Sequence, residues 1–241
     1  MAQLFPHLHA SAHVRWFTPD GPYWEPEWDR VFSWQVLLAL LAIGGVVGAL
    51  TLGQRALGDP LWPRPPMFQR LEPAAPAILG VQAAIALIYA ATQLDLFVPN
   101  IELPENVLGG AIAAVAIIAG FTFITGVLTR IGALIIIGLF RLAFGYTAWY
   151  EALEQIIFVG IALYLVAVGR GVVRFEDGEE EDRTDLSDRL LPYALPLLRW
   201  CAGISIIILG FTEKLLAPDL GVAFLQEYPH FNVPRELGWE W

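Results

Sequence analysis

The sequence has few charged residues and a single cysteine. Only 16% of its 241 residues are charged, against 56% hydrophobic, and the mean hydropathy is +0.57. These values lie outside the range of soluble globular proteins and predict an integral membrane protein. The lone thiol, Cys201, excludes an intramolecular disulfide, a CxxC redox pair, an iron-sulfur cluster and a cysteine zinc site within this chain. With 24 acidic and 14 basic residues the net charge is −10, which disfavours a nucleic-acid partner.

Histidine is absent from the apolar part of the chain. His7, His9, His13 and His230 all lie outside the hydrophobic runs, so a membrane haem with two histidine ligands is not expected here. His9 and His13 have i, i+4 spacing, but a solvated N-terminal segment is the preferred interpretation and no metal site is predicted. No glycine-rich dinucleotide or phosphate-binding motif is present, so no flavin is expected. Any redox chemistry would then use a quinone or a cofactor of another subunit.

Six hydrophobic runs are long enough, or nearly so, to cross a bilayer as helices. The long stretch 107–144 is interrupted only near Thr129-Arg130, where we expect a tight hairpin between the third and fourth spans. The fourth span reaches Tyr146 only if it includes Arg141. The sequence therefore predicts an all-α, six-helix membrane bundle. Its spans are Val31–Gly53, Ala77–Val98, the two halves of Val107–Phe144, Glu151–Gly169 and Pro192–Ala217.

The distribution of basic residues predicts the orientation. Residues 1–30 lack the apolar core of a signal peptide, so the first span is expected to stay in the chain. The loops Pro99–Asn106 and Thr147–Tyr150 contain no Lys or Arg, which places both termini outside the cell membrane. Residues 1–30 are then an extracytoplasmic segment, 174–191 an acidic cytoplasmic linker and 218–241 an amphipathic tail at the outer interface. The loops on the opposite side carry Arg55, Arg64, Arg70, Arg130, Arg170, Arg174, Arg183 and Arg189.

Small residues at i, i+4 spacing predict close helix packing. The pairs are Gly44 with Gly48, Gly45 with Ala49, and Gly110 with Ala114. Small side chains let helix backbones approach each other in lipid, so we interpret these pairs as packing surfaces rather than as a specific dimer interface.

An internal repeat emerges when the chain is aligned with itself at an offset of 119 residues. Pro99-Asn100 then aligns with Pro218-Asp219, and Asp95 with Lys214. The second span would open one four-helix unit, and the sixth span would open a second unit that stops after one helix. Either the chain is truncated, or another polypeptide supplies the missing helices, or the sixth span packs on the first. Four further positions are identical in the two segments: Ala83, Ile85, Ile88 and Leu96 align with Ala202, Ile204, Ile207 and Leu215.

Several segments together resemble the DoxX/DoxD-like family of membrane proteins. The stretch GFTFITGVLTRIGALIII, starting at Gly120, resembles the family's glycine-rich helix, Thr-Arg turn and following helix. YEALEQIIFVGIALYLVAVGRG, starting at Tyr150, is similar to its closing helix. LRWCAGISIIILGFTEKLLAPDL, starting at Leu198, is similar to its opening helix, with Glu213-Lys214 at the exit.

This resemblance implies a four-helix membrane unit over residues 77–173. It also implies a subunit of a thiosulfate:quinone oxidoreductase or of a terminal quinol oxidase, although relatives include non-enzymatic cargo receptors. The chain departs from the family pattern at Asp95, where the family has lysine, and in its incomplete second repeat.

Ionisable residues predict where chemistry would occur, because charge inside an apolar span is costly. Asp95, Arg141, Glu151, Glu154, Glu213 and Lys214 all fall near the outer level of their spans. In the functional interpretation they form a pocket in which Arg141 and Lys214 attract an anion or a quinone carbonyl, Glu154 or Asp95 exchanges protons, and Glu151 and Glu213 complete the polar lining. Tyr146, Trp149 and Tyr150 would surround the quinone ring. In the alternative interpretation, Arg141 and Glu154 form a purely structural ion pair.

The favoured function is a membrane subunit of a quinone-linked respiratory or sulfur-oxidising oxidoreductase, surrounded by lipid and joined to other membrane or peripheral subunits. The alternative is a non-catalytic accessory, scaffold or cargo-binding subunit. A small-solute transporter ranks last, because Gln82, Thr122 and Thr125 are the only polar residues near the middle of the spans.

Overall fold

The computed structural model describes residues 28–58, 66–98, 101–169, 185–216, 218–228 and 230. Within these ranges every regular element is a helix, and the sole β-type pairing is an isolated bridge between Asp95 and Glu102. The elements are α1 (Trp28–Val31), α2 (Trp34–Leu57), α3 (Pro66–Leu71), the 3₁₀ turn η2 (Glu72–Ala74), α4 (Ala75–Thr92), α5 (Val107–Thr125), α6 (Thr129–Ala143), α7 (Trp149–Glu154), α8 (Ile156–Val168), α9 (Asp185–Gly210), the π-helix η3 (Phe211–Leu216) and α10 (Pro218–Glu227).

Four of these helical segments are long and apolar enough to cross a membrane, which supports the prediction of a membrane protein. They are Trp34–Leu57, Gln69–Thr92, Val107–Thr125 and Asp188–Gly210. The predicted fourth and fifth spans contain shorter helices: α6 has 15 residues and α8 has 13. At 1.5 Å per residue these are shorter than the roughly 20 residues that a full crossing needs.

Several helices end at other residues than the sequence predicts, because turns and breaks in the backbone interrupt the apolar runs. The turn of the α5–α6 hairpin lies at Gly126–Leu128, just before the predicted Thr129-Arg130, and both Gly126 and Leu128 have positive φ. The second span was predicted to reach Val98, but α4 ends at Thr92 and the chain turns back. The predicted fifth span is divided at Gln155 into α7 and α8. The start of α5 at Val107 agrees with the prediction, because the Asn106 side chain accepts the Leu108 and Gly109 amides at 3.0 Å.

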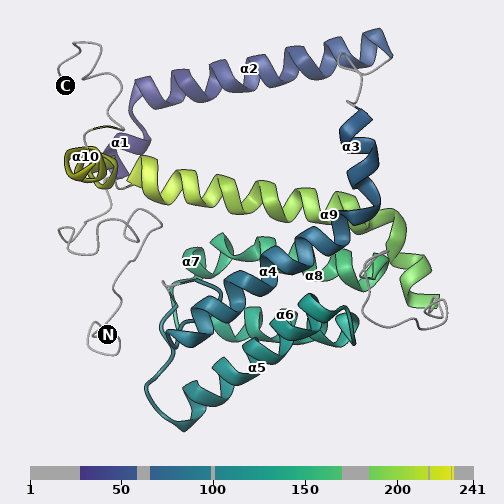
Figure 1. The fold of residues 1–241 in the computed structure, drawn as a ribbon. Coiled ribbons are helices and arrows are strands. Elements are labelled where there is room, and N and C mark those ends of the chain that lie inside the picture. Colours follow the sequence, from purple (N-terminus) through teal and green to yellow (C-terminus); the bar gives the residue numbers. More distant parts are fainter. Residues whose placement is uncertain are drawn as a thin grey trace.

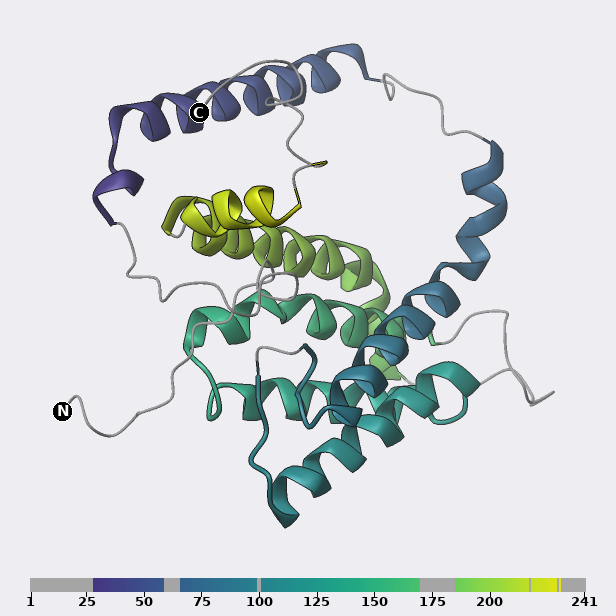
Figure 2. The same cartoon turned by 60° about the vertical axis from the view of Figure 1, so that its left-hand side comes forward.

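Helices α4, α5, α6 and α8 form the core. Helix α5 packs between α4 and α6, while α8 contacts α6 and α4 (Figures 1 and 2). Apolar side chains from all four helices fill the interior. The largest that are fully buried there are Leu87, Phe123, Ile136 and Leu165.

Glycines bring these helices together, but not the glycines that the spacing predicts. A Cβ at Gly132 would lie 1.8 Å from Thr122 Oγ1 of α5, and one at Gly160 would lie 2.6 Å from Cys201 Cβ of α9. In contrast, a Cβ at Gly44, Gly45, Gly48 or Gly110 would meet no atom within 4 Å. The prediction was wrong for these positions, because a small residue promotes packing only where a neighbouring helix faces it.

The described structure is all-helical, as predicted, but it does not confirm a six-helix bundle. Helix α9 packs along α8, whereas α2 has no buried residue and lies apart from the other long helices in Figure 1. Of the three explanations for the incomplete repeat, packing of the sixth span on the first is not seen among the described helices, since α9 packs against α8. The exposed surface of α2 is apolar on all sides, which suits lipid contact.

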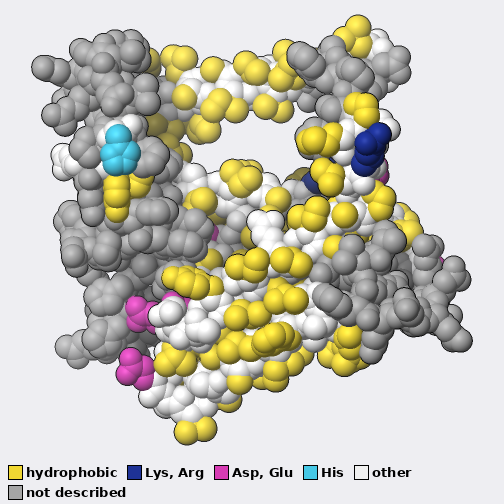
Figure 3. Space-filling view, in the orientation of Figure 1, with side chains coloured by type: hydrophobic (Ala, Val, Ile, Leu, Met, Phe, Trp, Pro, Cys, Tyr) yellow, Lys and Arg dark blue, Asp and Glu magenta, His cyan; other side chains and the backbone are white. Residues whose placement is uncertain are grey.

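The long helices alternate in direction, so the start of α2 and the end of α9 lie at the same end of the molecule (Figure 1). We call this the α7 end: it also holds the C-terminal ends of α4 and α6, with α7 and η3. Acidic side chains on the face shown in Figure 3 gather mainly at this end, and Lys and Arg side chains at the other. Helix α10 is seen end-on in Figure 1 while α9 lies in the plane, so the first part of the predicted tail crosses the end of the bundle.

Other predicted segments lie wholly or partly outside the described residues. These are residues 1–27 with His7, His9 and His13, the end of the predicted four-helix unit at 170–173, residues 174–184 of the acidic linker, and residues 231–241 of the tail. The end of the predicted linker, residues 185–191, is helical and forms the start of α9, with Pro192 and Pro196 inside the same helix.

Candidate functional site

Two of the predicted acids lie together on α7, the short helix that precedes the break at Gln155. Glu151 is 6% exposed and Glu154 is 4% exposed. The helix begins after Ala148 and ends because Gln155 leaves α geometry, with its N–H bonded back to Ala152 and Leu153. The break sets α7 at the end of the bundle, where it contacts α9. Two buried carboxyl groups therefore occupy one turn of helix.

Hydroxyl groups surround these two acids. Thr147 donates a hydrogen bond to the Glu151 carboxylate. From α9 and η3, Ser205 donates to the Glu154 backbone carbonyl, and Thr212 Oγ1 lies 2.7 Å from Glu154 Oε1. Hydrogen bonds from hydroxyls compensate for part of the cost of removing a carboxyl group from water. We call Thr147, Glu151, Glu154, Ser205 and Thr212 the α7 cluster.

Gln155 adds an amide to the same region. Its side chain is 2% exposed, and its Nε2 has no hydrogen-bond partner within the described part of the chain. An amide nitrogen carries two N–H donors, and burying them unpaired is unfavourable. A buried, unpaired donor group therefore follows Glu154 directly in the chain.

The aromatic residues next to the cluster are only partly enclosed. Tyr150, which lies outside the candidate membrane spans, has a pKa raised by burial and, to a smaller extent, by Glu151 and Glu154. Its ring meets that of Trp149 edge to face, with the centroids 5.8 Å apart. Trp149 is 65% exposed, as expected for an interfacial residue, and Tyr146 packs against the core.

Of the two predicted basic residues, Arg141 lies outside the α7 cluster. Arg141, at the end of α6, is exposed and makes no described ion pair with Glu154, so the structural Arg141–Glu154 pair is not formed. Glu213 and Lys214 belong to η3, and their side chains lie outside the described atoms. Of the predicted group, the structure brings together Glu151, Glu154 and Tyr150.

Asp95 lies at the same end but in a different pocket. After α4 ends, Leu94 adopts positive φ and the chain forms a small hairpin, in which the Leu96 N–H bonds Ile101 O and the Leu103 N–H bonds Leu94 O, both at 2.8 Å. The hairpin pairs Asp95 with Glu102. We call the adjoining cavity of about 520 Å³ the Asp95 pocket; it is lined by Tyr89, Gln93, Leu94, Asp95, Glu102, Leu103 and Glu105. No residue of the α7 cluster lines it.

Burial and the neighbouring carboxylate change the acidity of Asp95. The side chain is 9% exposed, and it lies beyond the end of the candidate span Gln69–Thr92. Burial, followed by repulsion from Glu102, raises the pKa of Asp95 from 3.8 to about 7. Asp95 can therefore gain or lose a proton near neutral pH.

The sequence interpretation missed the residues that complete both sites. Ser205 and Thr212 are isolated polar residues in the sixth run, which was a usable signal, but their alignment with Glu154 depends on how α9 packs on α8. Glu102 and Glu105 lie in a loop that the sequence identified, yet only the hairpin places them around Asp95. Among the described residues, the predicted acids thus belong to two sites that share no residue.

No group of three His, Cys, Asp or Glu side chains in the described ranges is placed to hold a metal ion. A quinone would need an apolar approach and polar contacts, and the α7 cluster offers buried polar groups at the end of an apolar bundle. Comparisons of the chain with protein-family models, with curated proteins and with solved structures found no significant match to any of them. The resemblance to the DoxX/DoxD-like family therefore stays a prediction from the sequence.

Proposed function

We propose that this chain is a membrane subunit of a quinone-linked respiratory or sulfur-oxidising oxidoreductase, and that the α7 cluster exchanges protons with the quinone. The observation that carries the proposal is the burial of Glu151 and Glu154, at 6% and 4% exposure, at one end of an apolar bundle. Buried acids are costly in such surroundings and are typical of proton-transfer sites. In this proposal both termini lie outside the cell membrane, as the distribution of basic residues predicts.

The chemistry of a quinone matches these groups. Reduction to the quinol consumes two electrons and two protons, and oxidation releases them. Electrons would come from or go to a cofactor of a partner subunit. Glu154 would exchange protons with one carbonyl oxygen of the quinone, while the Gln155 side chain donates an N–H to the other carbonyl oxygen. Thr212 holds the Glu154 carboxyl through its 2.7 Å hydrogen bond. Tyr146, Trp149 and Tyr150 supply aromatic surface beside it.

The second candidate is a non-catalytic accessory or cargo-binding subunit, favoured by one specific observation. Helix α2 has no buried residue, and α9 exposes Trp200, Ile206 and Ile207 beyond its contact with α8. Such apolar surfaces suit other membrane subunits as well as lipid. A transporter receives less support, because the hydroxyls of Thr122 and Thr125 bond carbonyls of their own helix.

The test uses Glu154→Gln in membranes that carry the native complex, with thiosulfate-dependent quinone reduction as the assay. We expect the rate to fall by at least about 100-fold, because the amide cannot transfer the proton. Glu72→Gln is the matched control: Glu72 is exposed in η2, outside the α7 cluster, and its loss should leave the rate unchanged.

Mass spectrometry of the native complex accompanies the assay and identifies bound quinone and partner subunits. If Glu154→Gln retains the full rate while the complex assembles normally, the proposed catalytic role is wrong and the accessory role is favoured. Arg141→Ala tests whether Arg141 belongs to the site. We expect little change in the rate of quinone reduction, since Arg141 is exposed and outside the α7 cluster.

A further inference from the structure

The Asp95 pocket contains a largely buried acid that has no hydrogen-bond donor or counter-ion among the described side chains. Asp95 is about nine-tenths buried, yet its carboxylate accepts no hydrogen bond from any described residue. The carboxylate oxygens of Asp95 are not among the fully enclosed, unpaired side-chain atoms of the described residues, so they open on the adjoining cavity, where a cationic donor could reach them. The α7 acids have hydroxyl partners, whereas Asp95 faces a cavity of about 520 Å³.

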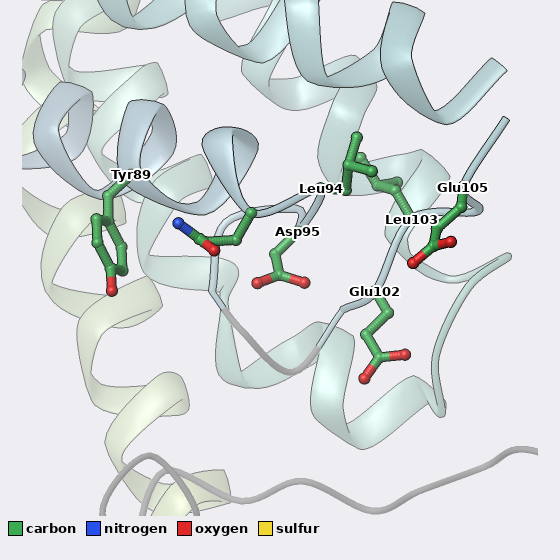
Figure 4. Close-up of a pocket in the computed structure, with 7 residues that line it drawn as sticks. Tyr89, Leu94, Asp95, Glu102, Leu103 and Glu105 are labelled. Atoms are coloured by element: carbon green, nitrogen blue, oxygen red, sulfur yellow. The ribbon is translucent and has the colours of Figure 1, made fainter. Parts of the chain in front are cut away.

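The rest of the lining is also acidic. Glu102 lies beside Asp95 across the antiparallel bridge, and Glu105 follows on the same loop. Figure 4 shows the carboxylates of Asp95 and Glu102 pointing the same way from the hairpin, with the Tyr89 ring on the far side of Asp95 from Glu102. The lining contains no Lys or Arg, so the described pocket offers three carboxylates and no compensating positive charge.

We propose that this pocket binds an organic cation with several N–H donors, such as a guanidinium or a primary ammonium group. The three carboxylates surround the cavity without forming a group placed to hold a metal ion. A larger cation with spread donors can reach several of them at once, and a guanidinium matches a carboxylate with two parallel hydrogen bonds. The Tyr89 ring adds a surface on which such a cation can stack.

The cation would arrive from the aqueous side, because the pocket follows the end of the candidate span Gln69–Thr92. It is either a free solute or an Arg or Lys side chain of a partner protein, since both present the same group. The inference does not depend on the quinone proposal, because the two sites share no residue.

Titration calorimetry on the full chain in lipid nanodiscs tests the proposal, with arginine amide as the probe. We expect saturable binding that Asp95→Asn weakens at least about tenfold, because a hydrogen bond to a buried charge is lost. Asp29→Asn makes the same chemical change at an exposed position of α1 and should leave binding unchanged. Tetramethylammonium, which has no N–H donor, should bind at least tenfold more weakly than arginine amide.

A second variant and a peptide probe complete the experiment. Glu102→Gln should also weaken arginine amide, so the test survives if Asp95→Asn does not fold with the wild-type elution volume and melting temperature. A short peptide with one internal arginine distinguishes the sources: tighter binding than the amide favours a partner protein, and weaker binding a free solute. Equal affinity for arginine amide in wild type and both variants would overturn the proposal, as would binding of calcium chloride without binding of arginine amide.

Discussion

The α7 cluster and the Asp95 pocket are both acidic and lie at the same end of the molecule, but their carboxyl groups differ in the hydrogen-bond donors around them. Thr212 reaches Glu154 from η3, and Thr147 reaches Glu151 from the preceding loop. Asp95 has no such donor, and its pKa is raised to about 7. The difference shows that burial alone does not define a site. A buried acid with donors is held in one arrangement, while a buried acid beside a cavity is open to a proton or a cation.

The largest expected effect comes from separating α9 from α8. Gly160→Val places a side chain against Cys201, where even a Cβ would be 2.6 Å away, so α9 must move and take Ser205 and Thr212 with it. We expect a loss of about 1–3 kcal/mol in unfolding free energy, as for other overpacked cores. Thermal unfolding in detergent micelles measures it.

The same variant sharpens the comparison of the two sites. Gly138→Val is the control, since a Cβ at Gly138 meets no atom within 4 Å and the residue is exposed on α6. Binding of arginine amide should persist in Gly160→Val, because α9 does not line the Asp95 pocket. Parallel loss of both sites would show that they are one unit.

A smaller effect is expected when the Glu154 partner is removed. Thr212→Val keeps the side-chain shape but deletes the hydroxyl, which leaves the buried carboxyl with one donor fewer. We expect a loss of about 1–2 kcal/mol. Thr125→Val serves as the control, because the Thr125 hydroxyl is bonded to the Phe121 carbonyl of its own helix. A similar loss of unfolding free energy in both variants would mean that the hydrogen bond from Thr212 to Glu154 stabilises the fold no more than a hydrogen bond within one helix.

A further effect concerns pH and the Asp95 pocket. Because the folded pKa of Asp95 is about 7 and its unfolded value is 3.8, the protonated form stabilises the fold; this contribution is complete below about pH 4 and is lost as pH rises through 7. Glu102 opposes the ionisation of Asp95, while Glu105 and Tyr89 line the same cavity and add no positive charge.

Asp95→Asn imitates the protonated acid at every pH. We expect its melting temperature to exceed that of the wild type at pH 8 and the difference to shrink as pH falls to 5, measured without added organic cation. Addition of arginine amide at pH 8 should stabilise the wild type more than the variant. A difference that is constant between pH 5 and pH 8 would contradict the raised pKa.

Much of the secondary structure could be predicted from local signals. The apolar runs predicted the start of α5 at Val107, where the Asn106 side chain caps the helix, and the end of α8 at Gly169, where φ is 71°. The α5–α6 hairpin was predicted within a few residues. Other ends were wrong: α4 stops at Thr92 because the apolar Leu94–Val98 segment is buried as a hairpin instead of continuing the helix. Hydrophobicity could not distinguish these two ways of burying the same residues.

The proposed repeat offers a related case. With the 119-residue offset, the end of regular α-helix at Gly210 aligns with Ala91, one residue before α4 ends at Thr92. The two segments then diverge, because one forms a hairpin with positive φ at Leu94 and Phe97 and the other a π-helix. Local sequence similarity thus accompanies a common break but different continuations.

The sequence by itself determined that this chain is an apolar, all-helical protein with acids concentrated near the ends of particular helices, because hydrophobic runs and helix signals act over a few neighbouring residues. The tertiary structure alone decided which acids share a site. Whether a carboxyl group meets Thr212, a second carboxylate or an open cavity depends on the packing of α9 on α8 and on the turn after α4, and these contacts join residues that are distant in the chain.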